Sequence, residues 1–163
     1  MIFLTVGTQF PFDRLVRTVD EVCENGFREE IFAQIGDTSY KPRNFKSVAS
    51  LSKNMFDEYM KDASSVISHA GMGVITMALD NKKPLLVIPR LKKYGEVVNN
   101  HQVAIARKFE KLGHILSAYN VEELPGKLQQ LKTFVPKIRE NQAQAVANRI
   151  ARFLQSLTNE PVR

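Results

Sequence analysis

The sequence is poor in the residues that cross-link small proteins or bind metal ions. It contains one cysteine, three histidines and no tryptophan among 163 residues. A lone cysteine cannot form an internal disulfide, and no cluster of His, Cys or acidic residues has the spacing of metal ligands. Cys23 lies in an apolar run without a basic cluster nearby, so we expect a buried, reduced thiol rather than a nucleophile. The composition therefore indicates a reducing compartment and a core held by ordinary packing.

Long apolar runs, a strong charge of one sign and nucleic-acid motifs are also missing. No stretch approaches the roughly 20 apolar residues that span a bilayer, and Met1–Val6 lacks the length and the basic start of a signal peptide. Lys and Arg number 23 against 17 Asp and Glu, which gives a formal net charge of +6. Without an Arg-rich tract or an aromatic RNA-binding motif, this excess favours an anionic small molecule or membrane surface over nucleic acid. We expect residues 1–163 to form one soluble domain.

Strand-like and helix-like segments alternate along the chain. Apolar runs at residues 2–6, 31–35, 65–69 and 84–89 are typical of buried strands, and segments of helical periodicity separate them. Parallel strands need such crossovers, so the pattern predicts an α/β fold with a doubly wound, mostly parallel, Rossmann-like sheet. Residues 136–157 have the spacing of a C-terminal amphipathic helix.

In doubly wound sheets, ligands bind beyond the carboxyl ends of the strands. The first such loop contains Gly7, Thr8 and Gln9, where the glycine allows a tight turn and the other two offer hydrogen-bonding groups. The same residues also fit a polar turn without a ligand.

A histidine, two glycines and a predicted helix start follow the central strand. The segment comprises His69, Ala70, Gly71, Met72 and Gly73. Free backbone N–H groups and the helix dipole would meet beside an imidazole there, and these are the parts of a phosphate-binding site. The alternative is a histidine that bonds only its own backbone. A dinucleotide-binding fingerprint is excluded, because its third glycine and its later acidic residue are absent.

The loop after residues 84–89 is rich in amides and charges. It contains Glu96, Asn100, His101 and Gln102, whose paired donors and acceptors suit a polyhydroxylated ligand such as a sugar. A solvated loop leading into a helix is the alternative. No acidic pair is present that would hold a metal-bound nucleotide, and no Gly-x-Ser-x-Gly motif indicates a serine hydrolase. The sequence thus predicts chemistry without a metal ion.

Three motifs in order resemble one known family. VGTQFPFDRLV, then VISHAGMGVI followed by KPLLVIPR, and finally KYGEVVNNHQ are similar to the catalytic subunits of two-component glycosyltransferases. These include the cytosolic subunit of the dolichol-linked N-acetylglucosaminyltransferase and subunits for bacterial capsule and exopolysaccharide. The resemblance runs from Met1 to about Thr133. It implies a glycosyltransferase family 28 C-terminal domain, the donor-binding half of a GT-B fold.

The resemblance also implies roles for the candidate residues. In the family, the turn matching residues 69–73 holds the nucleotide diphosphate, Asn100 to Gln102 lie at the sugar and ribose side, and Gly7 to Gln9 face the cleft between the two halves. His69 is a candidate catalytic residue, and the general base is not placed by the sequence.

The function implied is transfer of a sugar from a UDP-sugar to a polyprenyl-diphosphate-linked saccharide in capsule or exopolysaccharide synthesis. We expect no metal and no cofactor besides the donor, and a membrane-anchored partner that binds the lipid-linked acceptor at the cytoplasmic face of the membrane. One alternative is a non-catalytic nucleotide-sugar-binding regulatory module. Another is a metal-independent epimerase of GT-B type, which would normally need both halves in one longer chain.

One position departs from the family pattern. Many relatives have a glutamate for the ribose hydroxyls eight positions after the histidine, where this chain has Met77. In this respect the chain resembles the bacterial polysaccharide branch. A thioether is a poor acceptor, so we expect Glu96 to replace that carboxylate at the ribose. The alternative is that Glu96 pairs with Lys92 or Lys93 at the surface.

Overall fold

A computed structural model describes residues 1–138 and 143–158 of the chain. Six strands form one parallel sheet in the order β3-β2-β1-β4-β5-β6. The strands are β1 (Ile2–Thr5), β2 (Ile31–Gln34), β3 (Lys46–Val48), β4 (Ser65–His69), β5 (Leu85–Ile88) and β6 (Leu116–Ser117). This arrangement confirms the predicted doubly wound α/β fold, with the reversal of strand order lying between β1 and β4.

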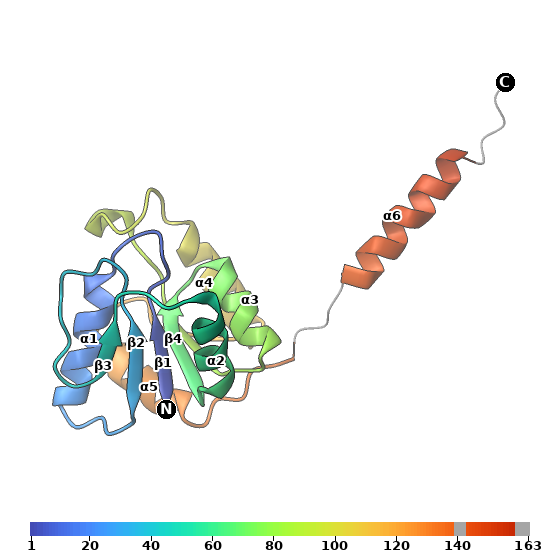
Figure 1. The fold of residues 1–163 in the computed structure, drawn as a ribbon. Coiled ribbons are helices and arrows are strands. Elements are labelled where there is room, and N and C mark those ends of the chain that lie inside the picture. Colours follow the sequence, from blue (N-terminus) through green and yellow to red (C-terminus); the bar gives the residue numbers. More distant parts are fainter. Residues whose placement is uncertain (139–142, 159–163) are drawn as a thin grey trace.

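Helices cover both faces of the sheet (Figure 1). One face carries α1 (Asp13–Glu24) and α5 (Leu124–Leu131), which contact each other. The other face carries α2 (Lys53–Asp62), α3 (Met72–Asp80) and α4 (His101–Lys111). A short 3-10 helix, η1 (Lys92–Tyr94), lies in the loop after β5.

The two faces of the sheet have separate hydrophobic cores, and β1 contributes to both. Leu4 packs toward α1 and α5, whereas Phe3 packs toward α2, α3 and α4. On that second face the Phe3 ring stacks on Tyr59, with centroids 5.6 Å apart, and meets Phe56 edge-on at 5.2 Å. Every residue of β1 is buried because both faces of the sheet are covered, and the strand is apolar up to Thr5, its last residue, rather than alternating.

The loop between β2 and β3 is held by a buried carboxylate on α1. Asp20 accepts hydrogen bonds from the backbone N–H of Arg43 at 3.0 Å and of Asn44 at 2.8 Å, and from the Tyr40 hydroxyl at 2.9 Å. Burial alone would raise the pKa of Asp20, but these bonds outweigh it and lower the pKa below its usual value. Nearby Cys23 is buried, as predicted, and burial raises the pKa of its thiol, with Asp20 adding to the effect.

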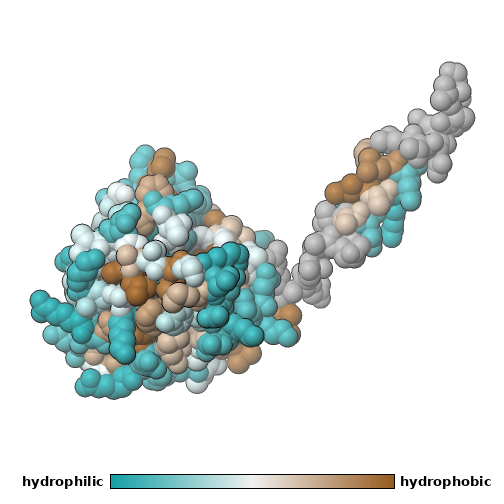
Figure 2. Space-filling view, viewed as in Figure 1, coloured by the Kyte–Doolittle hydropathy of each residue, from teal (hydrophilic) through white to brown (hydrophobic). Residues whose placement is uncertain are grey.

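The predicted C-terminal helix over residues 136–157 is described only in part. Residues 134–138 are not helical, residues 139–142 lie outside the described part of the chain, and α6 extends over Ala143–Thr158. Figure 1 shows α6 apart from the sheet and its covering helices, and Figure 2 shows apolar side chains along one side of it. Ile150 and Leu154 are exposed. No helix among the described residues has the length and apolar character needed to cross a bilayer.

Candidate functional site

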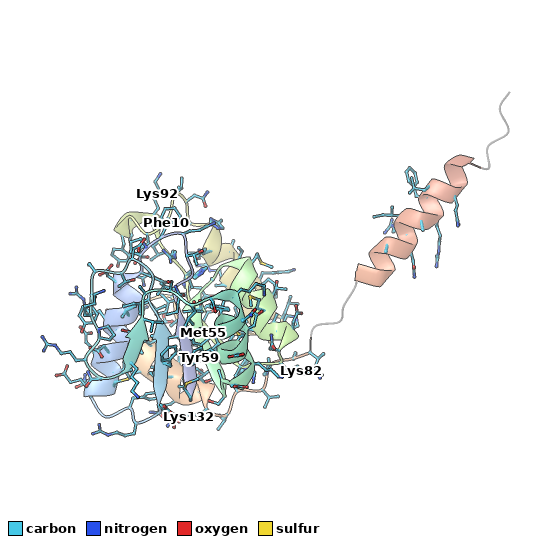
Figure 3. The ribbon with its side chains drawn as sticks, in the orientation of Figure 1. Phe10, Met55, Tyr59, Lys82, Lys92 and Lys132 are labelled. Atoms are coloured by element: carbon cyan, nitrogen blue, oxygen red, sulfur yellow. The ribbon has the colours of Figure 1, made fainter. Side chains whose placement is uncertain are left out.

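A cleft of about 790 Å³ lies beyond the carboxyl ends of β1 and β4, where the strand order reverses. Its walls come from the loops after β1 and β4, the start of α2, the first turns of α3 and α4, and the loop after β5. Figure 3 shows Phe10, one of its lining residues, at the edge of the domain opposite Lys132. This is the position at which parallel sheets of this topology bind ligands.

Most of the residues proposed from the sequence line this cleft. The structure places nine of them there, namely Gly7, Thr8, Gln9, His69, Gly71, Met72, Gly73, His101 and Gln102. Three are not part of the lining. Ala70 is fully buried in the core, Asn100 accepts a hydrogen bond from the backbone N–H of Lys92 at 2.9 Å, and Glu96 is buried below the loop.

The His69 ring lies between two glycines. A Cβ atom on Gly7 would lie 2.8 Å from Nε2 of His69, and a Cβ atom on Gly71 would lie 2.7 Å from its Nδ1. Gly7 also has a φ of +75°, a conformation that side-chain-bearing residues rarely adopt. The two glycines are therefore required by the imidazole itself, a reason that the sequence motif alone does not reveal.

His69 is held in its neutral form. Burial is the main cause, and the charge of Arg90 adds to it, so that the pKa of His69 falls from 6.5 to about 4. On the Nδ1 side of the ring, the side-chain nitrogen of Gln102 approaches to 3.5 Å. At neutral pH the site therefore presents an uncharged imidazole rather than an imidazolium.

The N-terminus of α3 opens into the cleft. Gly71 is its N-cap in extended conformation, and no side chain caps the helix. Gly73 lines the cleft, and a Cβ there would have no protein atom within 4 Å. A helix N-terminus with uncapped N–H groups favours an anion by about 0.3 to 1 kcal/mol through its dipole. The open space at Gly73 allows a ligand to approach these groups closely.

The loop that carries Gly7 to Phe10 is anchored by a buried arginine. The guanidinium of Arg90, which is 3% exposed, donates to the carbonyl oxygens of Val6 at 2.6 Å, Phe10 at 2.7 Å and Pro11 at 2.9 Å. The same guanidinium lies 4.7 Å from the centroid of the Phe12 ring. Burial lowers the pKa of Arg90 to about 10, partly offset by Glu96, so the group stays charged at neutral pH.

Glu96 occupies a place other than the one expected for it. Its two carboxylate oxygens each accept a hydrogen bond from Arg14 at 2.8 Å, and Oε2 also accepts from the backbone N–H of Leu91 at 2.9 Å. Glu96 is 8% exposed and does not line the cleft. The structure therefore shows a pair with Arg14 rather than with Lys92 or Lys93, and it places this carboxylate outside the described lining of the cleft, where we had expected it to meet a ribose.

Several lining residues were not identified from the sequence. Thr5 and Gln34 end β1 and β2, and the Gln34 amide donates to the carbonyl oxygens of Gly7 at 3.2 Å and Ala49 at 3.1 Å. These two residues could have been identified from the sequence, because polar residues that end buried strands lie at the ligand-binding edge of the sheet. Asp57 lies on α2 and is the one acidic side chain in the described lining of the cleft, which also includes Met77, the position singled out from the resemblance.

The residues that the structure describes contain no group of three or more His, Cys, Asp and Glu side chains arranged to hold a metal ion. The described lining of the cleft combines the N-terminus of α3, a neutral imidazole, amides, one carboxylate and the cations Lys53 and Arg90.

Comparison with known proteins identifies the family. Residues 1–157 match the sequence model of the glycosyltransferase family 28 C-terminal domain. The chain belongs to this family. Among curated relatives, the human UDP-N-acetylglucosamine transferase subunit ALG13 is 30% identical over 149 residues, which cover 78% of this chain and 13% of the human protein.

Other relatives carry the same name. The mouse subunit ALG13 is 32% identical over 123 residues, covering 69% of this chain and 10% of the relative. The ALG13 subunit of Eremothecium gossypii is 45% identical over 67 residues, covering 40% of this chain and 31% of the relative. This family 28 domain therefore spans a small part of the mammalian relatives' length and about a third of the fungal one.

Solved structures share the fold. The solution structure of ALG13 aligns with a TM-score of 0.60 at 23% identity, covering 91% of this chain and 93% of that one. MurG of Acinetobacter baumannii aligns with a TM-score of 0.59 at 17% identity, covering 82% of this chain and 42% of that one. Both likenesses agree with a Rossmann-like domain of GT-B type.

The low pKa of His69 predicts a pH-dependent stability. Because the folded-state pKa is about 4 and the ordinary value is 6.5, the unfolded chain binds an extra proton between these values. Stability should fall as the pH drops through this window, by about 3 kcal/mol at most, and His69→Gln should remove this component. Urea unfolding at pH 7 and pH 4.5 measures it, and an NMR titration of the ring checks the pKa directly. A ring that titrates near 6.5 would contradict the assignment.

The packing of His69 predicts that alanine destabilises the domain at Gly71 but not at Gly73. Gly71→Ala should destabilise the domain by about 1 to 3 kcal/mol, because Gly7 prevents the imidazole from moving away. Most of this cost should vanish in a His69→Ala background, which a double-mutant cycle of thermal unfolding measures.

Gly73→Ala is the matched control. The added methyl meets no protein atom and improves helix propensity, so it should leave the fold unchanged or stabilise it by about 0.5 kcal/mol. Equal destabilisation by the two alanines would show that His69 is not the cause.

Proposed function

We propose that this family 28 domain is the donor-binding subunit of a glycosyltransferase that uses a UDP-sugar and works with a membrane-anchored, acceptor-binding partner. The observation that carries the proposal is the uncapped N-terminus of α3, which opens into the cleft beside His69. Its N–H groups and dipole suit a diphosphate, and the surrounding amides suit a sugar and a ribose. The curated relatives, which are subunits of a UDP-N-acetylglucosamine transferase, support the nature of the donor.

The proposed chemistry is stabilisation of the departing diphosphate. Negative charge grows on this group as the bond to the sugar breaks, and fixed dipoles that already point at it lower the barrier. The first turn of α3 supplies such dipoles, and His69 supplies a neutral hydrogen-bonding group beside them. In this proposal neither a metal ion nor a cofactor takes part. The general base is assigned to the partner subunit together with the acceptor.

The acceptor that we propose is a saccharide linked to a polyprenyl diphosphate, at the cytoplasmic face of the membrane. We place the pathway in capsule or exopolysaccharide synthesis, and the support is Met77, a cleft residue that cannot serve as the carboxylate many relatives carry. The alternative function is a regulatory module that binds the nucleotide sugar without transferring it. The uncapped N-terminus of α3 would suit a transferase and a regulatory module equally well, so only a measurement of sugar transfer distinguishes the two functions.

Sugar transfer tests the proposal. The purified chain should transfer radiolabelled sugar from a panel of UDP-sugars to lipid-linked acceptor only when membranes containing the partner are present. Strong transfer by the chain alone would contradict the partner dependence. Binding of a UDP-sugar with no transfer in the presence of partner and acceptor would favour the regulatory module.

Asp57 should hold the ribose in place of the absent glutamate. It lines the cleft as the one acidic residue among the described lining, and it pairs with Lys53 on the same helix. Ribose hydroxyls need acceptors, and a carboxylate accepts stronger bonds than an amide. Asp57→Asn should therefore weaken UDP binding about tenfold in calorimetry, and the loss should shrink for the 2′-deoxy nucleotide.

Glu58→Gln is the control, since Glu58 is exposed on the same helix and does not line the cleft. It should leave UDP affinity unchanged. Equal losses for UDP and its 2′-deoxy form in the Asp57 variant would remove this residue from ribose recognition.

A further inference from the structure

We infer that Gln102 fixes the tautomer of His69, so that the imidazole carries its single proton on Nε2 and offers an N–H donor at the Gly7 side of the cleft. Gln102 is thereby a positioning residue, which acts through His69. The inference rests on two consecutive contacts, from the backbone of Arg90 to the amide of Gln102 and from there to the imidazole.

The first contact orients the Gln102 amide. The backbone N–H of Arg90 donates to Oε1 of Gln102 at 3.1 Å, and both residues are buried, with 3% and 6% exposure. A buried N–H without an acceptor is costly, and a glutamine amide has a single oxygen. The oxygen must therefore face Arg90, and the amide nitrogen must point the other way.

The second contact defines the protonation of the ring. The amide nitrogen of Gln102 lies 3.5 Å from Nδ1 of His69, a long contact that still sets which atom faces which. An amide nitrogen donates and does not accept, so Nδ1 must accept and carries no proton. A neutral imidazole has one proton, and it is left on Nε2.

The ring is closely packed between two glycines. Gly71 faces its Nδ1 and Cε1 edge, Gly7 faces its Nε2 and Cδ2 edge, and a Cβ atom on either glycine would clash with the ring. Burial is the main cause that disfavours a second proton, and the nearby charged guanidinium of Arg90 adds to it, in line with the pKa of about 4. The ring therefore stays neutral, with fixed donor and acceptor atoms, across the neutral pH range.

The consequence for the ligand rests on the proposed function. Nε2–H is a donor beside the uncapped N–H groups of α3, so it would bind an oxygen of the diphosphate without first taking up a proton. An acceptor atom at that place would instead repel the same oxygen. The orientation of one buried amide thus decides whether the imidazole attracts or repels an anion.

NMR of the full chain with ¹⁵N-labelled histidine tests the tautomer without any nucleotide. Long-range proton–nitrogen correlations at pH 7 distinguish a protonated Nε2 from a protonated Nδ1. We expect His69 to show a protonated Nε2 and an unprotonated Nδ1. The opposite pattern, or the average of two exchanging forms, would overturn the inference.

Two substitutions at Gln102 sharpen the test. In Gln102→Glu one carboxylate oxygen accepts the hydrogen bond from the backbone N–H of Arg90, and the other oxygen faces Nδ1 as a second acceptor. The imidazole proton should therefore move to Nδ1, and the pKa of His69 should rise from about 4. In Gln102→Met the side chain prefers neither form, and both tautomers should appear. Gln129→Glu, the same change at an exposed position on α5, should alter nothing.

The Met variant keeps the inference testable should the Glu variant fail to fold. An unchanged tautomer in a folded Gln102 variant would refute the positioning role. UDP binding is measured separately by calorimetry on the same proteins. A wild-type chain with the expected tautomer but no affinity for UDP would refute the proposed function and leave the tautomer established.

Discussion

The site depends on one buried cation, the guanidinium of Arg90. Three backbone carbonyls of the β1–α1 loop converge on it, while its own backbone N–H holds Gln102 at the start of α4. A carbonyl oxygen that loses such a partner inside the protein costs about 1 to 3 kcal/mol. Arg90 thus ties the loops after β1 and β5 into one rigid unit, and the position of Gly7 against His69 follows from it.

The counter-charge of this unit explains why Glu96 is absent from the cleft. Removing two guanidinium groups from water is expensive, and a carboxylate that accepts two hydrogen bonds from Arg14 offsets part of that cost. Arg14 also stacks on Phe12 and Tyr94, at 5.2 Å and 5.0 Å from the ring centroids. Glu96 is therefore used to assemble the loop, and the acidic group that reaches the cleft comes from α2 instead.

Strands β1, β2, β4 and β5 and the edge of the sheet at which ligands bind were predictable, because buried parallel strands read as short apolar runs. The His69–Gly73 segment was likewise evident from its glycines. The pairing of Glu96 with Arg14 was not predictable, because the two residues lie 82 positions apart in sequence and only the folded chain brings them together. Asp57 was missed for a similar reason: a charged residue on a helix has no local signal that distinguishes a cleft from open solvent. Residues 136–138 were expected to be helical and are not, since periodicity alone does not mark where a helix begins.

The cluster of Arg14, Arg90 and Glu96 has a consequence for kinetics. Two guanidinium groups against one carboxylate leave an excess of one positive charge beneath the loop that borders the cleft. Low-dielectric walls focus such a field toward the opening, so an anionic ligand is drawn in before it touches any side chain. Under the proposed function, the association rate of a nucleotide diphosphate would thereby depend partly on Arg14, which does not line the cleft, and dissolved salt, which shortens the reach of the field, would slow capture more than release.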